Sequence, residues 1–249
     1  IAQTGKDIHG NSWLQPIMSS YGDYKAPIAV WLVALSVKLF GLSEIAVRIP
    51  FAFFSLVGAL GIVFLLKEVS LILKIKLSRT LTAITVLLLL TSPWHYHFGR
   101  IGFESGLSLN FIILSTLFTF IGLRKHSVWL LVGGFFAVIS SYSYFSARYI
   151  IVPYILIIFI SLYKESISRW KWVIASFLLF GLAQLPLYTS DLYKPSQELR
   201  LSAKNILSNE GLAKQSAALI YQSGNTIVSR IAYHRYWILA KEFLTNYFT

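Results

Sequence analysis

Long apolar runs, broken by short basic connections, limit what this sequence can fold into. A helix needs about 20 mostly apolar residues to cross a bilayer, since no water there can satisfy stray backbone groups. The chain has 56% hydrophobic residues and a mean hydropathy of +0.65. This is more apolar residue than a soluble domain needs to fill one core. We therefore predict an all-α, polytopic membrane bundle with about six transmembrane helices. The predicted spans are residues 47–66, 80–94, 106–123, 128–145, 149–163 and 172–188.

The basic residues gather in the short connections, which predicts how the bundle is oriented. The formal net charge is +12, but topology explains this excess without a nucleic-acid partner, since basic residues in short loops stay cytoplasmic. No phosphate-binding glycine loop, RNA-binding signature or zinc-finger spacing supports nucleic-acid binding. The absence of cysteine excludes disulfides and thiolate metal sites. The three clusters predicted to be cytoplasmic are Lys67, Lys74, Lys76 and Arg79; Arg124 and Lys125; and Lys164, Arg169 and Lys171.

Residues 26–42 form an apolar stretch that the same alternation of loops keeps outside. Lys38 argues against a full crossing there, since a lysine well inside a membrane helix costs about 2.5–3.5 kcal/mol. We predict an interfacial or re-entrant helix over this stretch, and an amphipathic helix over residues 226–248. The predicted organisation is a first outer loop, a transmembrane bundle and an extracytoplasmic segment: residues 1–46, 47–189 and 190–249.

The stretch SSYGDYKAPI, residues 19–28, places two charges directly before that interfacial helix. Asp23 and Lys25 flank Tyr24, and Pro27 suits the first turn of a following helix. A lysine at the mouth of a low-dielectric cavity is a good partner for a lipid phosphate, because the attraction strengthens as water is excluded. The alternative is a lysine that reaches the membrane surface beside its counter-ion.

A second polar group lies in SPWHYHFGRIGFES, residues 92–105, which is predicted to be an outward connection. His95 and His97 have a spacing that suits metal ligands on an extended segment, but no third ligand lies nearby, so no metal is expected. Arg100 and Glu104 are four apart and fit an ion pair on one helix face. Alternatively, Arg100 points into a cavity as a second anion contact.

Arginines also stand near the outward ends of predicted helices. Arg148 lies in SSYSYFSARYIIVP, residues 140–153, and is either an interfacial anchor or a ligand contact. Arg48 and Arg200 have the same two interpretations. The sequence has no nucleophile elbow and no phosphate-binding loop, so nothing supports a soluble-type hydrolase or an ATP-driven transporter.

Five motifs in order resemble bacterial members of the dolichyl-phosphate-mannose protein mannosyltransferase superfamily, which are related to aminoarabinose lipid A transferases. They are GKDIHGN, YGDYKAPIAVWL, FGLSEIAVRIPFA, LTSPWHYHFGRIGFES and YSYFSARYIIVP, and the likeness covers most of residues 1–200. The resemblance implies a glycosyltransferase of the multi-span C type in the inner (plasma) membrane. Such an enzyme moves a sugar, with inversion, from a polyprenyl phosphate donor to an extracytoplasmic protein, lipid or polysaccharide.

The resemblance also implies roles for single residues. Lys25 in DYKAP matches the family's phosphate-contacting lysine, and Arg100 and Arg148 are expected to assist it. The family's catalytic base is an acidic residue that we expect upstream of Ile1, so neither Asp7 nor Asp23 takes that role by default, and the chain by itself is expected to be inactive. No cofactor is expected. The possible substrate-site residues are Asp23, Tyr24, His95, His97, Glu104 and Arg200.

A transporter or flippase of lipid-linked sugars is the rival interpretation. It would use similar aromatic and cationic residues to hold its cargo. Such a protein should carry ionisable residues near the middle of the membrane, and the predicted spans have almost none.

Overall fold

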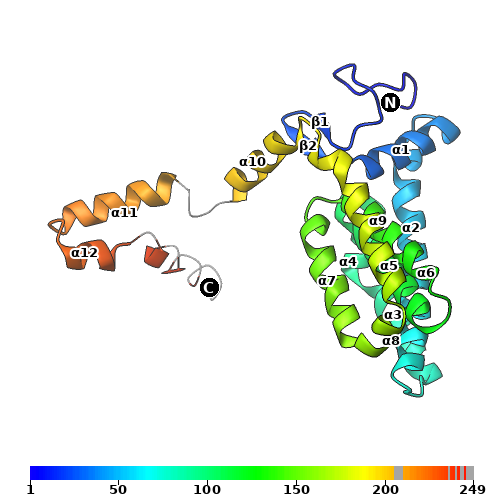
Figure 1. Ribbon diagram of the computed structural model, residues 1–249. Coiled ribbons are helices and arrows are strands. Elements are labelled where there is room, and N and C mark those ends of the chain that lie inside the picture. The colour runs from blue at the N-terminus through cyan, green and yellow to red at the C-terminus, as the bar shows by residue number, and fades with distance from the viewer. Residues whose placement is uncertain (205–209, 235, 239, 242–243, 245–249) are drawn as a thin grey trace. The chain divides into compact units, whose positions relative to one another are not determined.

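Figure 1 shows a computed structural model of the chain, which describes residues 1–204, 210–234, 236–238, 240–241 and 244. The chain divides into two compact units, Ile1–Tyr193 and Lys194–Thr249. The elements of the first unit are β1 (Met18–Ser20), β2 (Asp23–Lys25), α1 (Pro27–Phe40), α2 (Glu44–Ile72), α3 (Arg79–Thr91), α4 (Pro93–Ile101), α5 (Glu104–Arg124), α6 (Trp129–Ser143), α7 (Ala147–Ser161), α8 (Tyr163–Ser168) and α9 (Trp170–Tyr188).

The predicted all-α membrane class is confirmed, because each predicted span contains a helix. Three helices, α2, α5 and α9, are long and apolar enough by themselves to cross a membrane. The apolar helices α1, α3, α6 and α7 are shorter. The 14 residues of α1 extend for about 21 Å, which is less than the thickness of the hydrocarbon. The helices α6 and α7 have only 15 residues each, so length does not distinguish α1 from them, and its interfacial position stays a prediction.

The helices α2 and α5 run parallel through the bundle. Near their N-terminal ends Phe54 packs on Phe111, with ring centroids 4.8 Å apart, and near their C-terminal ends Glu68 pairs with Arg124. The segment that joins them, α3 followed by α4, must therefore return along the bundle. Gly58 permits the close approach, because a Cβ atom there would lie 2.0 Å from Oδ1 of Asn110.

Small residues bring α5 and α6 together in an antiparallel pair. The hydroxyl groups of Ser108 and Ser140 lie 2.8 Å apart, and Ser115 donates a hydrogen bond of 2.8 Å to the carbonyl of Gly133. Such contacts are typical of membrane helices, because apolar surface burial gives little drive for association in lipid. The helix α9 also packs on α6, where a Cβ atom at Gly134 would lie 2.6 Å from the Ser176 hydroxyl, and α6 and α9 lie side by side in Figure 1.

These helix directions bring the three basic connections to one end of the bundle. We call it the basic end and define it by Glu68, Arg124 and Arg169, which lie in contact there. The opposite end, which we call the hairpin end, carries the N-terminus of α2 and the C-terminus of α4, since Gly102 packs against Phe51. The alternation of loops predicts this grouping, and the side of the membrane that each end faces stays a prediction.

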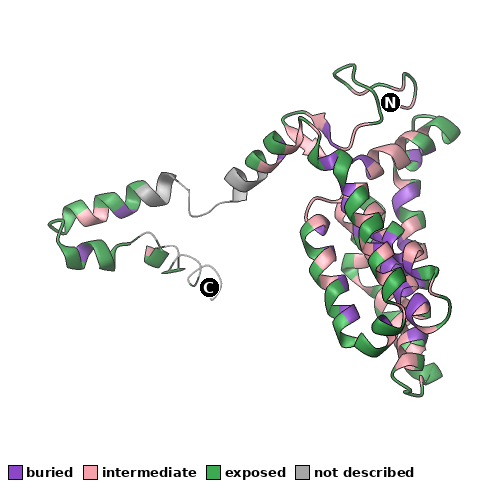
Figure 2. Ribbon diagram, viewed as in Figure 1, coloured by how far each residue is buried: buried purple, intermediate pink, exposed green. Residues whose placement is uncertain are grey.

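The outward faces of the bundle carry large apolar side chains. Phe53, Leu60 and Phe64 of α2 are each more than half exposed, as are Ile160 of α7 and Leu182 of α9. Figure 2 shows exposed stretches along the helices of the bundle, with buried positions interspersed among them. A surface of this size would be a liability in water and is what a helix presents to lipid.

The predicted span 80–94 and the predicted loop 92–105 form a broken helix instead. The helix α3 ends at Thr91, Ser92 has extended backbone angles, and Pro93 begins α4. Proline suits a first helical turn because it has no N–H to leave unpaired. The helices α3 and α4 are about 20 and 14 Å long, so each alone is too short to cross. The region predicted as a loop is therefore largely helical, and α4 packs on α2.

The second unit contains the remaining described helices. They are α10 (Tyr193–Lys204), which begins one residue before the boundary, α11 (Glu210–Gln222) and α12 (Ile227–Ala232). Thr226 caps α12 by accepting a hydrogen bond from the Ser229 amide. Within the predicted helix 226–248, α12 covers residues 227–232, and the described residues 236–238, 240–241 and 244 are also helical. The other residues after 234 lie outside those described.

Candidate functional site

A β-hairpin, absent from the all-α prediction, presents the charges of SSYGDYK. Strands β1 and β2 pair antiparallel, with Ser20 opposite Asp23 and Met18 opposite Lys25. Tyr21 and Gly22 form the turn with φ angles of +47° and +78°. Two positive φ angles define the turn that best matches the twist of paired strands, and glycine adopts them without steric cost.

The hairpin places Asp23 and Lys25 on one face, since strand side chains alternate. Their charged atoms lie 2.9 Å apart, and both side chains are about 40% exposed. Asp23 also accepts a hydrogen bond of 2.7 Å from the backbone amide of Tyr24. An ion pair this exposed contributes little stability.

Lys25 lines a cavity of about 350 Å³ whose lining is mostly apolar. Its polar residues are Asp7, Ser19, Ser20 and Lys25, and its apolar residues include Val33 of α1 and Val47 of α2. We call it the Lys25 cavity. A lysine in a mostly apolar lining suits a ligand with an anionic head and a hydrocarbon chain.

Asp7 has a structural role in the loop that borders the Lys25 cavity. Burial opposes ionisation of its carboxyl, but hydrogen bonds from Asn11, His9 and Gln15 outweigh that effect and lower the pKa of Asp7. The amides of His9 and Asn11 donate to one carboxylate oxygen at 2.9 and 2.8 Å. A carboxylate whose oxygens already accept several hydrogen bonds, and whose pKa is lowered, is a poor proton acceptor. We therefore do not assign the role of catalytic base to Asp7.

The helix α4 turns its two histidines in different directions. The Nε2 atom of His95 lies 3.1 Å from the hydroxyl of Ser55 in α2, whereas His97 is exposed. Helical neighbours two positions apart point about 200° apart, so the pairing considered for an extended segment is not formed. Among the described residues, no group of three metal-ligating side chains gathers.

A groove between α2 and α4 holds the arginines of the hairpin end. We call it the α2–α4 groove, and its volume is about 510 Å³. Its residues are Arg48, Ala52, Ser55, Leu56 and Ala59 of α2 with His95, Tyr96, Gly99 and Arg100 of α4. A further cavity of about 270 Å³ shares Ser55, His95 and Gly99 with it and reaches Asn110 and Ile113 of α5.

Arg100 and Glu104 lie on different helices, so the expected pair on one helix face is wrong. Gly102, with φ of +75°, ends α4 in a left-handed conformation, and Glu104 begins α5. A glycine tolerates that conformation because it has no Cβ. The guanidinium of Arg100 instead lies 6.0 Å from the ring centre of Tyr96.

Arg148 belongs to a third location, at the start of α7. Its Nε atom donates a hydrogen bond of 3.0 Å to the carbonyl of Ser141, and its guanidinium lies 5.3 Å from the ring centre of Phe145. The side chain of Arg200 lies outside the described residues, although its backbone belongs to α10. Lys25 and Arg100 thus line different cavities, and Arg148 is held by the junction of α6 and α7.

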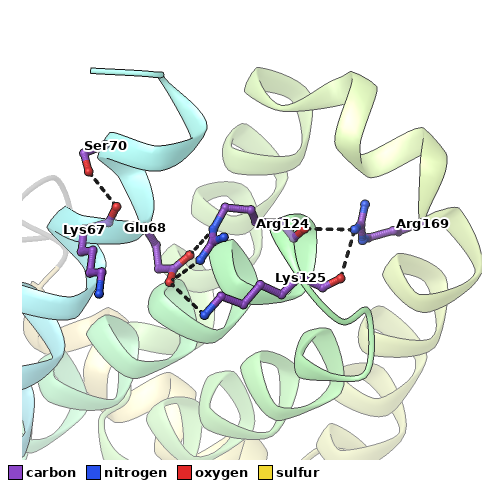
Figure 3. Close-up of polar contacts among 6 residues, drawn as sticks. All are labelled: Lys67, Glu68, Ser70, Arg124, Lys125 and Arg169. Atoms are coloured by element: carbon purple, nitrogen blue, oxygen red, sulfur yellow. Dashed lines mark hydrogen bonds and ion pairs between the residues drawn. The ribbon is translucent and has the colours of Figure 1, made fainter. Parts of the chain in front are cut away.

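Glu68 forms a buried charge cluster that was not anticipated from the sequence. Its carboxylate accepts hydrogen bonds of 2.6 and 2.8 Å from Nε and Nη2 of Arg124, and Nζ of Lys125 lies 3.8 Å away. Arg169 donates to the carbonyls of Arg124 and Lys125 (Figure 3). The signal in the sequence was a single acid, beside Lys67, at the end of a span and before a basic loop.

The fold and its cavities define a helical membrane protein with cationic sites at one end of its bundle. The model of the dolichyl-phosphate-mannose-protein mannosyltransferase family matches residues 24–189, which is more than half of the chain. The chain therefore belongs to that family and is a membrane glycosyltransferase of the multi-span C type. No curated protein and no solved structure matches it.

Proposed function

We propose that this protein transfers a sugar from a polyprenyl phosphate donor to an extracytoplasmic acceptor, with inversion, and that Lys25 binds the donor phosphate. The observation that carries this proposal is the Lys25 cavity, where a cation lines a mostly apolar space. An amphiphilic donor needs a cation for its phosphate and an apolar surface for its hydrocarbon chain. The family to which the chain belongs supplies the reaction class.

Lys25 acts on the leaving group. Negative charge builds on the donor phosphate as the glycosidic bond breaks, and a fixed ammonium in a site of low dielectric stabilises that charge. Asp23, at 2.9 Å, holds the ammonium while the site is empty and yields it to the phosphate. The hairpin turn at Tyr21 and Gly22 fixes the pair at the edge of α1, so little reorganisation is needed when the donor arrives.

A transporter or flippase for lipid-linked sugars is disfavoured by where the charges lie. In the spanning helices α2, α5 and α9, the Asp, Glu, Lys and Arg residues occupy the turns nearest the helix ends. A protein that carries a charged headgroup across the membrane needs ionisable or hydrated positions near the middle. Chemistry at one membrane surface does not need them.

The test is Lys25→Ala in the full-length protein, assayed with a radiolabelled polyprenyl-phosphate-sugar donor. We expect transfer to fall about 100- to 1,000-fold, the usual cost of removing one well-placed charge donor. Lys25→Arg should recover part of the activity, because it keeps the charge and changes the geometry. Lys38→Ala, which removes an exposed lysine from the last turn of α1, is the matched control and should leave transfer unchanged.

Wild-type turnover by a well-expressed Lys25→Ala protein would remove Lys25 from the site. The same donor separates the rival function, because a transporter moves the labelled lipid across vesicles without cleaving it. Transfer of labelled sugar to the acceptor, with release of polyprenyl phosphate, is the expected result in the wild type, and Lys25→Ala should lose it.

A further inference from the structure

We propose that the α2–α4 groove binds the acceptor of this reaction, and that the acceptor is a lipid with an anionic headgroup. The proposal rests on the proposed function for the role of acceptor, whereas binding of the lipid itself can be measured separately. It is carried by the polarity of the groove, its rigid packing and its separation from the Lys25 cavity.

The groove carries its cations at one end. Arg48 lies in the second turn of α2 and Arg100 in the last turn of α4, and both line the same space. Arginine is suited to phosphate because its planar fork donates two parallel hydrogen bonds. Glu44 pairs with Arg48 across one helical turn, but the Glu44 side chain is 76% exposed, so a phosphate can displace it at small cost.

Beyond the arginines the wall of the groove becomes apolar. Ala52, Leu56 and Ala59 follow Arg48 along one face of α2, toward the middle of the span. Ala52 is exposed and the Leu56 side chain is 58% exposed, so this face is open to the surrounding lipid. A hydrocarbon chain beneath a headgroup at Arg48 and Arg100 would lie on it. A water-soluble protein or polysaccharide acceptor has no hydrocarbon chain that could bind to this apolar face of α2.

The groove is held in shape by close packing of α4 on α2. A Cβ atom at Gly99 would lie 2.8 Å from the Ser55 hydroxyl, and the same hydroxyl is 3.1 Å from Nε2 of His95. These contacts fix the rotation of α4 and therefore the direction in which Arg100 leaves the helix. A site fixed in this way loses less entropy when it binds.

The groove and the Lys25 cavity lie on different sides of the first turns of α2. Val47 lines the Lys25 cavity, whereas the next residue, Arg48, lines the groove. Successive residues of a helix point about 100° apart, and the two sites share no lining residue. A glycosyltransferase must hold two substrates at once, and this arrangement gives each a cationic site of its own.

The experiment is photo-crosslinking of the full-length protein in phosphatidylcholine nanodiscs. Photoreactive phosphatidic acid is compared with photoreactive diacylglycerol that has the same chains, and labelled peptides are mapped by mass spectrometry. We expect the anionic probe to label α2 and α4 near Ala52 and Tyr96. Replacing both arginines, Arg48→Ala with Arg100→Ala, should lower that labelling about tenfold or more.

Three further variants separate the possible reasons for a loss of labelling. Ala52→Phe fills the apolar part of the α2–α4 groove while it keeps both arginines, and it should also lower labelling. Arg79→Ala, an exposed arginine at the start of α3, is the matched control and should have no effect. Lys25→Ala should leave labelling of the groove intact although it lowers transfer about 100- to 1,000-fold, so failure of this inference and failure of the proposed function give different results.

Several results would overturn the inference. Equal labelling by diacylglycerol, or labelling that persists in the double arginine variant, would show that the groove takes lipid without regard to charge. Complete competition by millimolar inorganic phosphate would show a site for a free anion. Loss of groove labelling in Lys25→Ala would make the groove part of the donor site.

Discussion

Replacing Glu68 by glutamine should destabilise the bundle by about 2 kcal/mol. The carboxylate accepts two hydrogen bonds from Arg124, and its side chain is only 7% exposed. Glutamine keeps one acceptor oxygen, so the substitution loses one charge-assisted hydrogen bond and the negative charge. Breaking a fully buried pair costs about 3–5 kcal/mol. We expect less here, because the Arg124 side chain is 27% exposed and water can reach it.

The assay is equilibrium unfolding in mixed micelles titrated with sodium dodecyl sulfate, which gives a free energy of unfolding. Glu44→Gln is the matched control, since the Glu44 side chain is 76% exposed and its pair with Arg48 should contribute less than about 0.5 kcal/mol. A double-mutant cycle with Arg124→Gln should give a coupling energy of about 1–2 kcal/mol. The reasoning is refuted if Glu68→Gln loses no more stability than Glu44→Gln, or if the coupling energy is zero.

Two further substitutions test the packing and the hairpin. Gly58→Leu should lower the free energy of unfolding by about 1–3 kcal/mol, because its side chain would occupy the space of Asn110; Gly181→Leu, which meets no neighbour within 4 Å, should have little effect by the same unfolding assay. Gly22→Val should distort the turn, whose φ of +78° a β-branched residue resists, and so reduce sugar transfer while the unfolding of the bundle stays unchanged. A fully active Gly22→Val enzyme would show that the hairpin does not position Lys25.

The spans could be predicted from the sequence because lipid imposes a simple rule. Backbone groups in the hydrocarbon must be satisfied within the helix, so an apolar run of sufficient length has one available structure. The same rule, with the basic loops, predicted which ends of the helices lie together. The contact of Glu68 with Arg124 and Arg169 at one end agrees with that grouping.

The hairpin and the broken helix could not be read from hydropathy. Strands β1 and β2 each have only three residues, and their signal lies in the turn conformation of Tyr21 and Gly22. A tyrosine in that conformation is not a typical hairpin signature. For α4, the polar residues of SPWHYHFGRI suggested a loop, whereas Ser92 and Pro93 are an acceptable helix start. Proline at the first helical position is compatible with a helix although Ser92 makes no side-chain cap hydrogen bond, and composition was misleading.

The distribution of the cations was also beyond sequence reasoning, since it depends on the rotation of single helices. Lys25, Arg100 and Arg148 were grouped because each stands near a predicted outward end. The packing of Gly99 on Ser55 turns Arg100 toward Arg48, and the carbonyl of Ser141 holds Arg148 at the junction of α6 and α7. A rotation of α4 by one residue position, about 100°, would have removed Arg100 from the groove.

The two proposals together place the transfer step at the rim of the bundle. Val47 and Arg48 belong to adjacent sites, and the first turn of α2 begins at Glu44 with Ser43 as its cap. A sugar that leaves a phosphate near Lys25 for a headgroup near Arg100 must pass over this turn, since the helix below it is packed against α1 and α5. A bulky substitution in the first turn of α2 should therefore block transfer, while the donor still binds in the Lys25 cavity and the acceptor lipid still binds in the α2–α4 groove. A single shared lipid site would not produce this combination.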